Sequence, residues 1–314
     1  MEFLASDRQL LDGIDLSCKT MGGAEENKQG EAVCVRRTYL ESLDLSKATH
    51  GWEASLKDAD LSGAYLHGAD LSGARLYNTN LIGADLHNAN LSNANLSFTN
   101  LKDANLQSAN LSNANLSFTS PNGANLEGGN LSGTKSLRAN FSDVNLRSAD
   151  LSDATLVNAN LNSTHLGNAN LSGTSMLNAD LSGAYLRSAN LSGANLYDAN
   201  LSGADLEGAN LSGAFLRDTN LSDTELWRAN LSSASLVGAI LKGANIRGVE
   251  LRTTHLSQAN FKDAKYIKSA DFTDAWAWSD TPPHNLPIKI DLCVLQDGLN
   301  MSSRRPDPCI APSE

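Results

Sequence analysis

A five-residue rhythm constrains the fold of this chain more than any other feature. Every fifth residue from Leu56 to Tyr266 gives 43 positions, and 36 of these positions hold Leu. The residue two before each of these centres is always Ala, Thr, Val or Gly. Each pentapeptide therefore combines one large apolar residue with one small residue. The centres that are not Leu are Pro121, Ser136, Phe141, Met176, Ile246, Phe261 and Tyr266.

A period of five fits neither standard secondary structure. On an α-helix, successive centres would step by about 140° around the axis and form no stripe. On a flat strand, an odd spacing would send alternate centres to opposite faces. A chain that turns one corner per pentapeptide can direct all centres to one axis, and four such corners close a coil of twenty residues. The segment Leu91–Thr99 recurs letter for letter at Leu111–Thr119, twenty residues later.

The pattern of small residue, Asn or Asp, Leu, Ser or Thr, and a variable residue, as in ANLSG and ADLSG, resembles the pentapeptide repeat family. This resemblance covers about two thirds of the chain. It implies an all-β fold, a right-handed quadrilateral β-helix of about ten to eleven coils with irregular caps. Pro121 and Ser136 depart from the pattern at centres, so we expect a backbone distortion or a bulge there.

The repeat divides the chain into three parts. We expect an N-terminal cap with the first irregular repeats over residues 1–55, the solenoid over 56–266, and a cap with a Pro-rich tail over 267–314. The register of five slips by one residue between His50 and Leu56, and again between Tyr266 and Phe272. Caps are expected because an open stack exposes unpaired edges that can polymerise.

Charge argues against partners that need a basic field. The formal net charge of the chain is -11, so nucleic acid is not an expected partner. No apolar run reaches the roughly 20 residues that span a bilayer. The first residues also lack a secretory signal, which favours a cytoplasmic protein as the chain stands.

The four cysteines leave the compartment open. Cys18 and Cys34 precede the repeats, and Cys293 and Cys309 follow them. Each pair is a possible disulfide that would imply an extracytoplasmic, oxidising compartment; four unpaired thiols are the alternative. None of them forms a Cys-x-x-Cys pair, so a zinc site is not favoured.

A search for catalytic motifs is negative. The sequence contains no phosphate-binding glycine loop and no His-Glu-x-x-His motif. His67 and His87 lie twenty residues apart and thus on adjacent coils, but a closed metal site needs more ligands than two imidazoles. We therefore expect a solvated histidine ladder, no catalytic residues, no cofactor, no metal and no small-molecule substrate.

One outer column differs from the others. We call the residue after a centre its first corner residue, the next its second corner residue, and the residue before the centre its face residue. Two columns of first corner residues are small and polar, and a third carries mixed charges. The fourth column is apolar, and single outward apolar residues are common whereas a contiguous stripe is not. The stripe, with two second corner residues included, comprises Tyr77, Phe98, Phe118, Leu137, Val157, Leu177, Tyr197 and Val237.

Two functional classes compete for this sequence. The stripe favours a non-enzymatic scaffold that binds a partner protein or a second copy of itself; the alternatives are coverage by the chain's own N-terminal segment and, less favoured, membrane contact. The family resemblance also allows a DNA mimic that protects gyrase. Residues 56–266 carry 18 acidic and 14 basic side chains, a net charge of -4. A B-DNA segment of about 50 Å carries roughly 30 negative charges. The solenoid is therefore a poor electrostatic copy of DNA.

Overall fold

The computed structural model describes residues 24–26, 32–34, 55–278, 281–286 and 293–295. The chain divides into two compact units, Met1–Ala169 and Asn170–Glu314, each of which is described by itself. The named elements are β1 (Ala24–Glu26), β2 (Ala32–Cys34), the 3-10 helix η1 (Ile267–Ser269), β3 (Trp276–Trp278) and β4 (Cys293–Leu295). β1 pairs antiparallel with β2, and β3 pairs parallel with β4.

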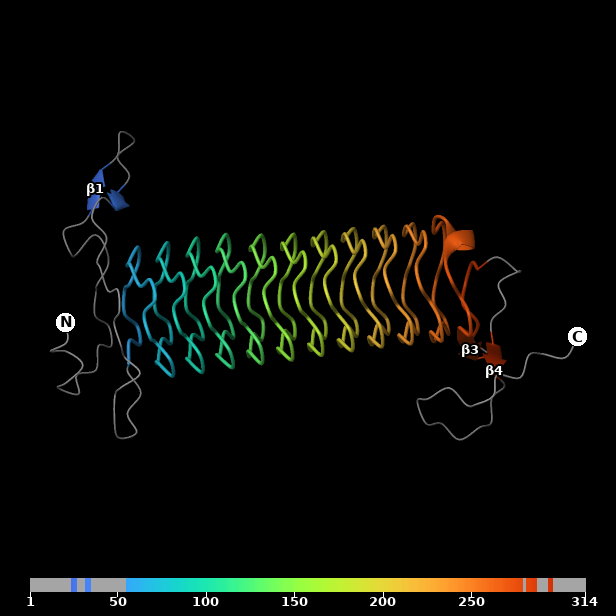
Figure 1. The fold of residues 1–314 in the computed structure, drawn as a ribbon, viewed down its shortest axis with the longest axis horizontal. Coiled ribbons are helices and arrows are strands. Elements are labelled where there is room, and N and C mark those ends of the chain that lie inside the picture. Colours follow the sequence, from blue (N-terminus) through green and yellow to red (C-terminus); the bar gives the residue numbers. More distant parts are fainter. Residues whose placement is uncertain (1–23, 27–31, 35–54, 279–280, 287–292, 296–314) are drawn as a thin grey trace, which may run out of the picture. The chain divides into compact units, whose positions relative to one another are not determined.

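Within each unit the chain forms a stack of like coils (Figure 1), and these coils are a right-handed quadrilateral β-helix. One residue per pentapeptide forms a parallel bridge to the residue twenty positions later, such as Tyr65 to Asp85. The Leu66 N–H donates to the Asp85 carbonyl at 2.7 Å, and the Asp85 N–H donates to the Ala64 carbonyl at 2.9 Å. The turn closes within one coil, between consecutive pentapeptides, where the Ala69 N–H donates to the Leu66 carbonyl at 3.0 Å. The predicted fold class is confirmed.

The predicted centres and small residues form the core of each unit. Leu66, Leu86 and Leu106 in the first unit and Leu191 and Leu211 in the second are fully buried. Burial of one Leu side chain stabilises a fold by roughly 1.5–3 kcal/mol before entropy is counted. The residue two before each centre is usually Ala, and its small side chain lets the walls of the coil approach each other closely.

Threonine replaces the small residue without leaving its hydroxyl unpaired. Thr79 is buried, and its Oγ1 donates to the carbonyl of Leu56 on the previous coil at 2.8 Å. Thr174 instead donates to the carbonyl of Leu171 within its own turn at 2.8 Å. A buried hydroxyl without a partner would cost about 1–3 kcal/mol, so these bonds make Thr compatible with the core.

The Asn or Asp before each centre stabilises both the turn and the stack. The Ser92 N–H donates to Oδ1 of Asn90 at 3.2 Å, which braces the corner. Asn90 Nδ2 donates to Oδ1 of Asp70 on the previous coil at 3.0 Å. This double role explains why Asn recurs at the face position even though its side chain is only half-buried.

No residue is inserted at Pro121 or Ser136, so the bulge that was one form of the expected distortion does not occur. The period of five continues through both centres, and the Ser136 N–H donates to the Thr155 carbonyl at 2.8 Å. Pro121 has no N–H to donate, and it occupies its centre without an inserted residue. Ser136 is fully buried, and its Oγ lies 3.5 Å from Oγ1 of Thr134.

Tyr266 is not an inward centre, and here the sequence prediction is wrong. Its side chain is 58% exposed and its φ is 62°, because η1 starts at the next residue. The coil geometry continues after η1 with an offset of one residue, so that Glu250 bridges Asp271 and His255 bridges Trp276. The register slip predicted in this segment is therefore confirmed, and regular pairing extends beyond residue 266.

The segment after β3 adds a last layer to the second unit. The Gln258 N–H donates to the Thr281 carbonyl at 2.9 Å, and the Phe261 N–H donates to the His284 carbonyl at 3.0 Å. These bonds satisfy backbone donors that would otherwise be unpaired at the edge of the last coil. Trp276 is buried and stacks on His255 with ring centroids 3.7 Å apart.

Several sequence predictions fall outside the described residues. The slip between His50 and Leu56 involves positions that are not described, as do Cys18 and Cys309. For Cys34 and Cys293 the structure gives the strand backbone alone. The possible disulfides and the three-part division of the chain therefore stay predictions.

The second corner residues have left-handed backbone conformations. Two glycines at this position share the conformation but differ in the space around them, which gives a testable prediction. Gly243 and Gly193 have φ of 71° and 66°. A Cβ at Gly193 would meet nothing within 4 Å, whereas a Cβ at Gly243 would collide with the carboxylate of Asp223 on the previous coil. We expect Gly243→Ala to destabilise the fold by about 1 kcal/mol more than Gly193→Ala, measured by denaturant unfolding. Adding Asp223→Ser to Gly243→Ala should remove the excess; an unchanged excess would contradict the packing explanation.

His255 should make the second unit sensitive to acid. Burial lowers the pKa of His255 to about 4, below its ordinary value of 6.5. The unfolded chain then binds the proton more readily than the folded chain. The free energy of unfolding is therefore at its full value above pH 6.5 and decreases as the pH falls toward 4. The loss should not exceed about 3 kcal/mol. Denaturant unfolding of wild type and His255→Asn at pH 7.5, 5.5 and 4.5 should show a smaller pH dependence in the variant, and equal slopes would contradict the assignment.

Candidate interaction surface

The apolar residues of the predicted stripe in the first unit gather at one corner of successive coils. Tyr77, Phe98, Phe118 and Leu137 are 37%, 48%, 39% and 36% exposed. We call these four residues the aromatic corner. The next member of the column, Val157, is only half-buried. Four exposed apolar side chains on consecutive coils form a contiguous surface, which is uncommon on a water-facing wall.

The rings of the aromatic corner touch one another. The Tyr77 and Phe98 centroids lie 5.4 Å apart with a tilt of 58°, and the Phe98 and Phe118 centroids lie 4.8 Å apart with a tilt of 10°. The spacing of these two phenyl rings matches the spacing of neighbouring strands. The coil stack therefore sets the separation of the rings, and the backbone holds them in place.

Phe98 and Phe118 stand where a bulky residue is unfavourable. Their φ angles are 61° and 60°, in the left-handed region. A residue with a Cβ pays roughly 1–2 kcal/mol there, and Gly, Asn and Asp tolerate the region best. In the same column the two adjoining coils carry Asn78 and Arg138, and the coil after Arg138 carries Asn158. The two phenylalanines are thus placed against local preference, which favours a role other than stability.

The first unit also carries charges around this corner. Lys57 Nζ lies 5.9 Å from the Tyr77 ring centroid and 3.5 Å from a carboxylate oxygen of Asp58. Arg75, Lys135 and Arg138 are exposed and make no ion pair with any residue that the structure describes. Reading only the residue after each centre missed these three cations, because they occupy face and second corner positions.

In the second unit the predicted stripe residues are less exposed. Leu177, Tyr197 and Val237 are half-buried, and the guanidinium of Arg217 lies 5.7 Å from the Tyr197 ring centroid. The more exposed apolar residues were missed by the sequence analysis: Tyr185, Phe215 and Ile240 are 50%, 57% and 40% exposed. All three stand at face positions, where Asn or Asp is usual. An aromatic or aliphatic residue at a face position was the sequence feature that could have identified these three exposed side chains.

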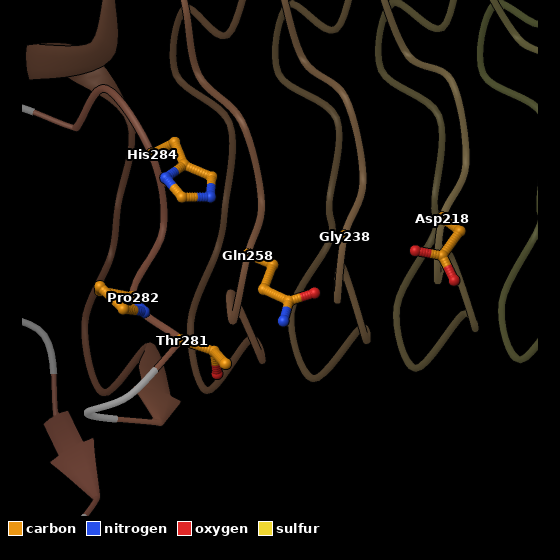
Figure 2. A pocket seen from close by; sticks show the side chains of 6 residues that line it. All are labelled: Asp218, Gly238, Gln258, Thr281, Pro282 and His284. Carbon is orange, nitrogen blue, oxygen red and sulfur yellow. The ribbon is translucent and has the colours of Figure 1, made fainter.

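Two shallow hollows lie on the second unit. The first has a volume of about 390 Å³. Figure 2 labels the residues that line it, from successive coils and from the segment after β3: Asp218, Gly238, Gln258, Thr281, Pro282 and His284. The second has a volume of about 240 Å³ and is lined by Arg187, Glu207, Glu225, Trp227, Asn245, Arg247 and Tyr266. Small open hollows of this kind differ from the enclosed pockets that usually hold cofactors.

Of the charged groups that line the second hollow, Arg187 and Glu207 form an ion pair. Arg187 lies 2.5 Å from Asp205 and 3.0 Å from Glu207, and these carboxylates raise the pKa of its guanidinium. Asn245 Nδ2 donates to Glu225 at 2.7 Å. Near the end of the coils, hydrogen bonds from Thr273 and Arg252 lower the pKa of Asp271 to about 2. Each of these groups is held by its neighbours, which does not resemble a poised acid–base pair.

The two histidines stack on adjacent coils as predicted, but both are half-buried, so the ladder is not fully solvated. The His67 and His87 ring centroids lie 5.2 Å apart, with an interplanar angle of 21°. Within the described part of the chain, no group of three or more His, Cys, Asp and Glu side chains is arranged to hold a metal ion. No helix among the described residues is long and apolar enough to cross a membrane.

These coils define a class of protein, and the chain belongs to the pentapeptide repeat family. The model of that family, pentapeptide repeats, matches in eight overlapping copies that run from residue 54 to residue 275: 54–93, 89–133, 122–156, 139–178, 164–203, 199–238, 216–252 and 234–275. A comparison with curated proteins gives no significant match.

Among solved structures, the chain is similar to HetL from the cyanobacterium Nostoc sp. strain PCC 7120, a pentapeptide repeat protein involved in heterocyst differentiation regulation. The two are 30% identical over 76% of this chain and 91% of HetL, with a TM-score of 0.31. It is also similar to QnrB1, a plasmid-mediated fluoroquinolone resistance protein, with 18% identity over 72% of this chain and 90% of that protein, and a TM-score of 0.27. Rfr23 from the cyanobacterium Cyanothece 51142 is 42% identical over 32% of this chain and 62% of its own, with a TM-score of 0.17.

The conformation of Phe98 and Phe118 predicts that the fold does not need them. The double variant Phe98→Asn, Phe118→Asn relieves the strain of the left-handed backbone, which stabilises the fold, but it loses the ring stack, which destabilises it. Each effect is about 1 kcal/mol, so the two largely cancel. We expect unfolding free energies of wild type and variant to agree within about 1 kcal/mol. On the same coils, Leu96→Asn should cost several times more because Leu96 is fully buried. A large loss in the double variant would show that the rings serve stability.

Proposed function

We propose that this chain is a non-enzymatic protein-interaction scaffold, in which the aromatic corner of the first unit contacts another protein or a second copy of the chain. The observation that carries this proposal is the pair Phe98 and Phe118. The two rings are exposed, stacked and built on backbone positions that disfavour them. A feature that adds no net stability and exposes apolar surface is explained most simply if something binds it.

The surrounding coils support the role of a rigid scaffold. Aromatic side chains lose little conformational entropy when a partner covers them, particularly when their positions are already fixed. Here the Phe98 N–H donates to the Ser117 carbonyl at 3.0 Å, and the Phe118 N–H donates to the Leu137 carbonyl at 2.9 Å. The backbone ladder thus orders the contact surface before binding.

The competing DNA-mimic function has less support from charge. The coils of residues 56–266 have a net charge of only -4, and Arg75, Lys135 and Arg138 stand exposed on one side of the first unit. A protein that replaces DNA on an enzyme needs a dense negative surface instead. Specific, saturable inhibition of gyrase supercoiling by the purified protein would favour the mimic and count against the scaffold.

The proposal is tested with the full chain and its double variant Phe98→Asn, Phe118→Asn. Sedimentation velocity measures self-association, and a random peptide library displayed on phage measures the capacity to bind other chains. We expect association, or a set of enriched peptides, that is lost in the double variant. The matched control is Asn93→Ser, Asn113→Ser, which changes second corner residues of the same coils on another column.

A monomeric wild type, together with a library in which no peptide distinguishes wild type from the double variant, would overturn the proposed contact surface. Peptides that bind another part of the chain would bind the double variant as well as the wild type, and they would give no support to the proposed contact surface. Wild-type binding that the control variant also loses would point to a general disturbance of the coils.

A further inference from the structure

We infer that the aromatic corner binds a segment of another protein in which acidic residues and apolar residues stand together. This inference rests on the proposed function and adds the chemistry of the partner. The inference comes from the distribution of charge over the first unit. Residues 56–169 contain six basic and nine acidic side chains. Their placement on the coils is uneven.

Four of the six basic residues lie in the pentapeptides that build the aromatic corner and its column. These pentapeptides contribute the face and corner residues of centres 56, 76, 96, 116, 136 and 156, and their charged members are Lys57, Asp58, Arg75, Lys135 and Arg138. Four basic and one acidic residue give a local charge of +3. The rest of residues 56–169 holds two basic and eight acidic residues, a charge of -6. The cations are therefore concentrated beside the exposed rings of a chain that is acidic overall.

The cations near the rings are available to a partner. Arg75 precedes Tyr77 by two residues, and Lys135 and Arg138 flank Leu137 at the other end of the aromatic corner. All three are exposed, and none is engaged in an ion pair within the described coils. Lys57 is the exception, since it pairs with Asp58. On the far side of the corner the charged face residue Asp60 is half-buried, where it accepts bonds from Ser62 N–H and Asn80 Nδ2.

A second copy of the chain fits this surface poorly. A two-fold axis through the aromatic corner would place cations of one copy against cations of the other, and like charges across an interface cost affinity. Contact with an acidic face of another copy would join unlike surfaces and would extend into fibres. A partner whose acidic residues flank apolar ones satisfies both the rings and the cations.

Anionic membranes and nucleic acid fit less well. Anionic lipid surfaces usually attract clusters of about 4–8 cations. Here three cations lack an ion pair within the described coils, and the rest of residues 56–169 is acidic. Single-stranded nucleic acid stacks its bases on open aromatic faces. Phe98 and Phe118 already cover part of each other's faces, at an interplanar angle of 10°.

The test reads the charge of peptides selected from a random phage library by the full chain, after counter-selection on Phe98→Asn, Phe118→Asn. We expect enriched peptides with a net negative charge and several large apolar residues. Lys135→Glu, Arg138→Glu should weaken their binding at least 10-fold. The matched pair Lys102→Glu, Arg147→Glu changes two exposed cations outside these pentapeptides and should alter binding less than 2-fold. Raising the salt concentration should weaken binding to wild type.

Enriched peptides that are neutral or basic, or an equal effect of the two charge-reversal pairs, would overturn the acidic partner while leaving the proposed contact surface intact. A library without any peptide that depends on Phe98 and Phe118 would overturn the acidic partner, and together with a monomeric wild type it would overturn the proposed contact surface as well. Phosphatidylserine vesicles and a single-stranded oligothymidylate serve as further probes. If either one binds more tightly than the selected peptides, and that binding depends on the two phenylalanines, the partner is a membrane or a nucleic acid and the inference is wrong.

Discussion

The fold depends on one repeated interaction, the backbone bridge between residues twenty positions apart. The centre of a pentapeptide donates its N–H to the next coil, and the residue before it donates back to the previous one, as Leu66 and Asp85 show. Each coil thereby becomes the template for the following coil. The leucine core depends on this registration, because a centre packs on a centre only when both coils repeat at twenty residues.

Registration also explains why a small set of residue types suffices. The face Asn bonds the turn of its own coil and the side chain of the coil before it, so one residue serves two structural roles. The second corner residue must adopt a left-handed conformation, which limits it mainly to Gly, Asn, Asp and Ser. Against this background an unusual residue is informative. Phe98, Phe118 and Arg138 all occupy such positions, and all three lie in the proposed contact region of the first unit.

The same registration turns sequence into a surface pattern. Side chains in one column repeat at the spacing of strands, so rings that are twenty residues apart become stacking partners and isolated cations become neighbours of those rings. A binding surface arises in this way from corner residues alone, without changing a single core residue. Proposals about the aromatic corner can therefore be tested with substitutions that leave the coil intact.

The sequence by itself determined the coil, its core and its register, because those depend on a local pattern that is repeated many times. It also placed Tyr77, Phe98, Phe118 and Leu137 in one outward column. Only the tertiary structure decided how exposed each member is and which rings stack, since those depend on packing between coils. It moved Tyr266 from the core to the surface, because η1 inserts one residue before the last turn. It also revealed Phe215 and the cations beside the aromatic corner, whose face and corner positions acquire meaning only when the coils are stacked.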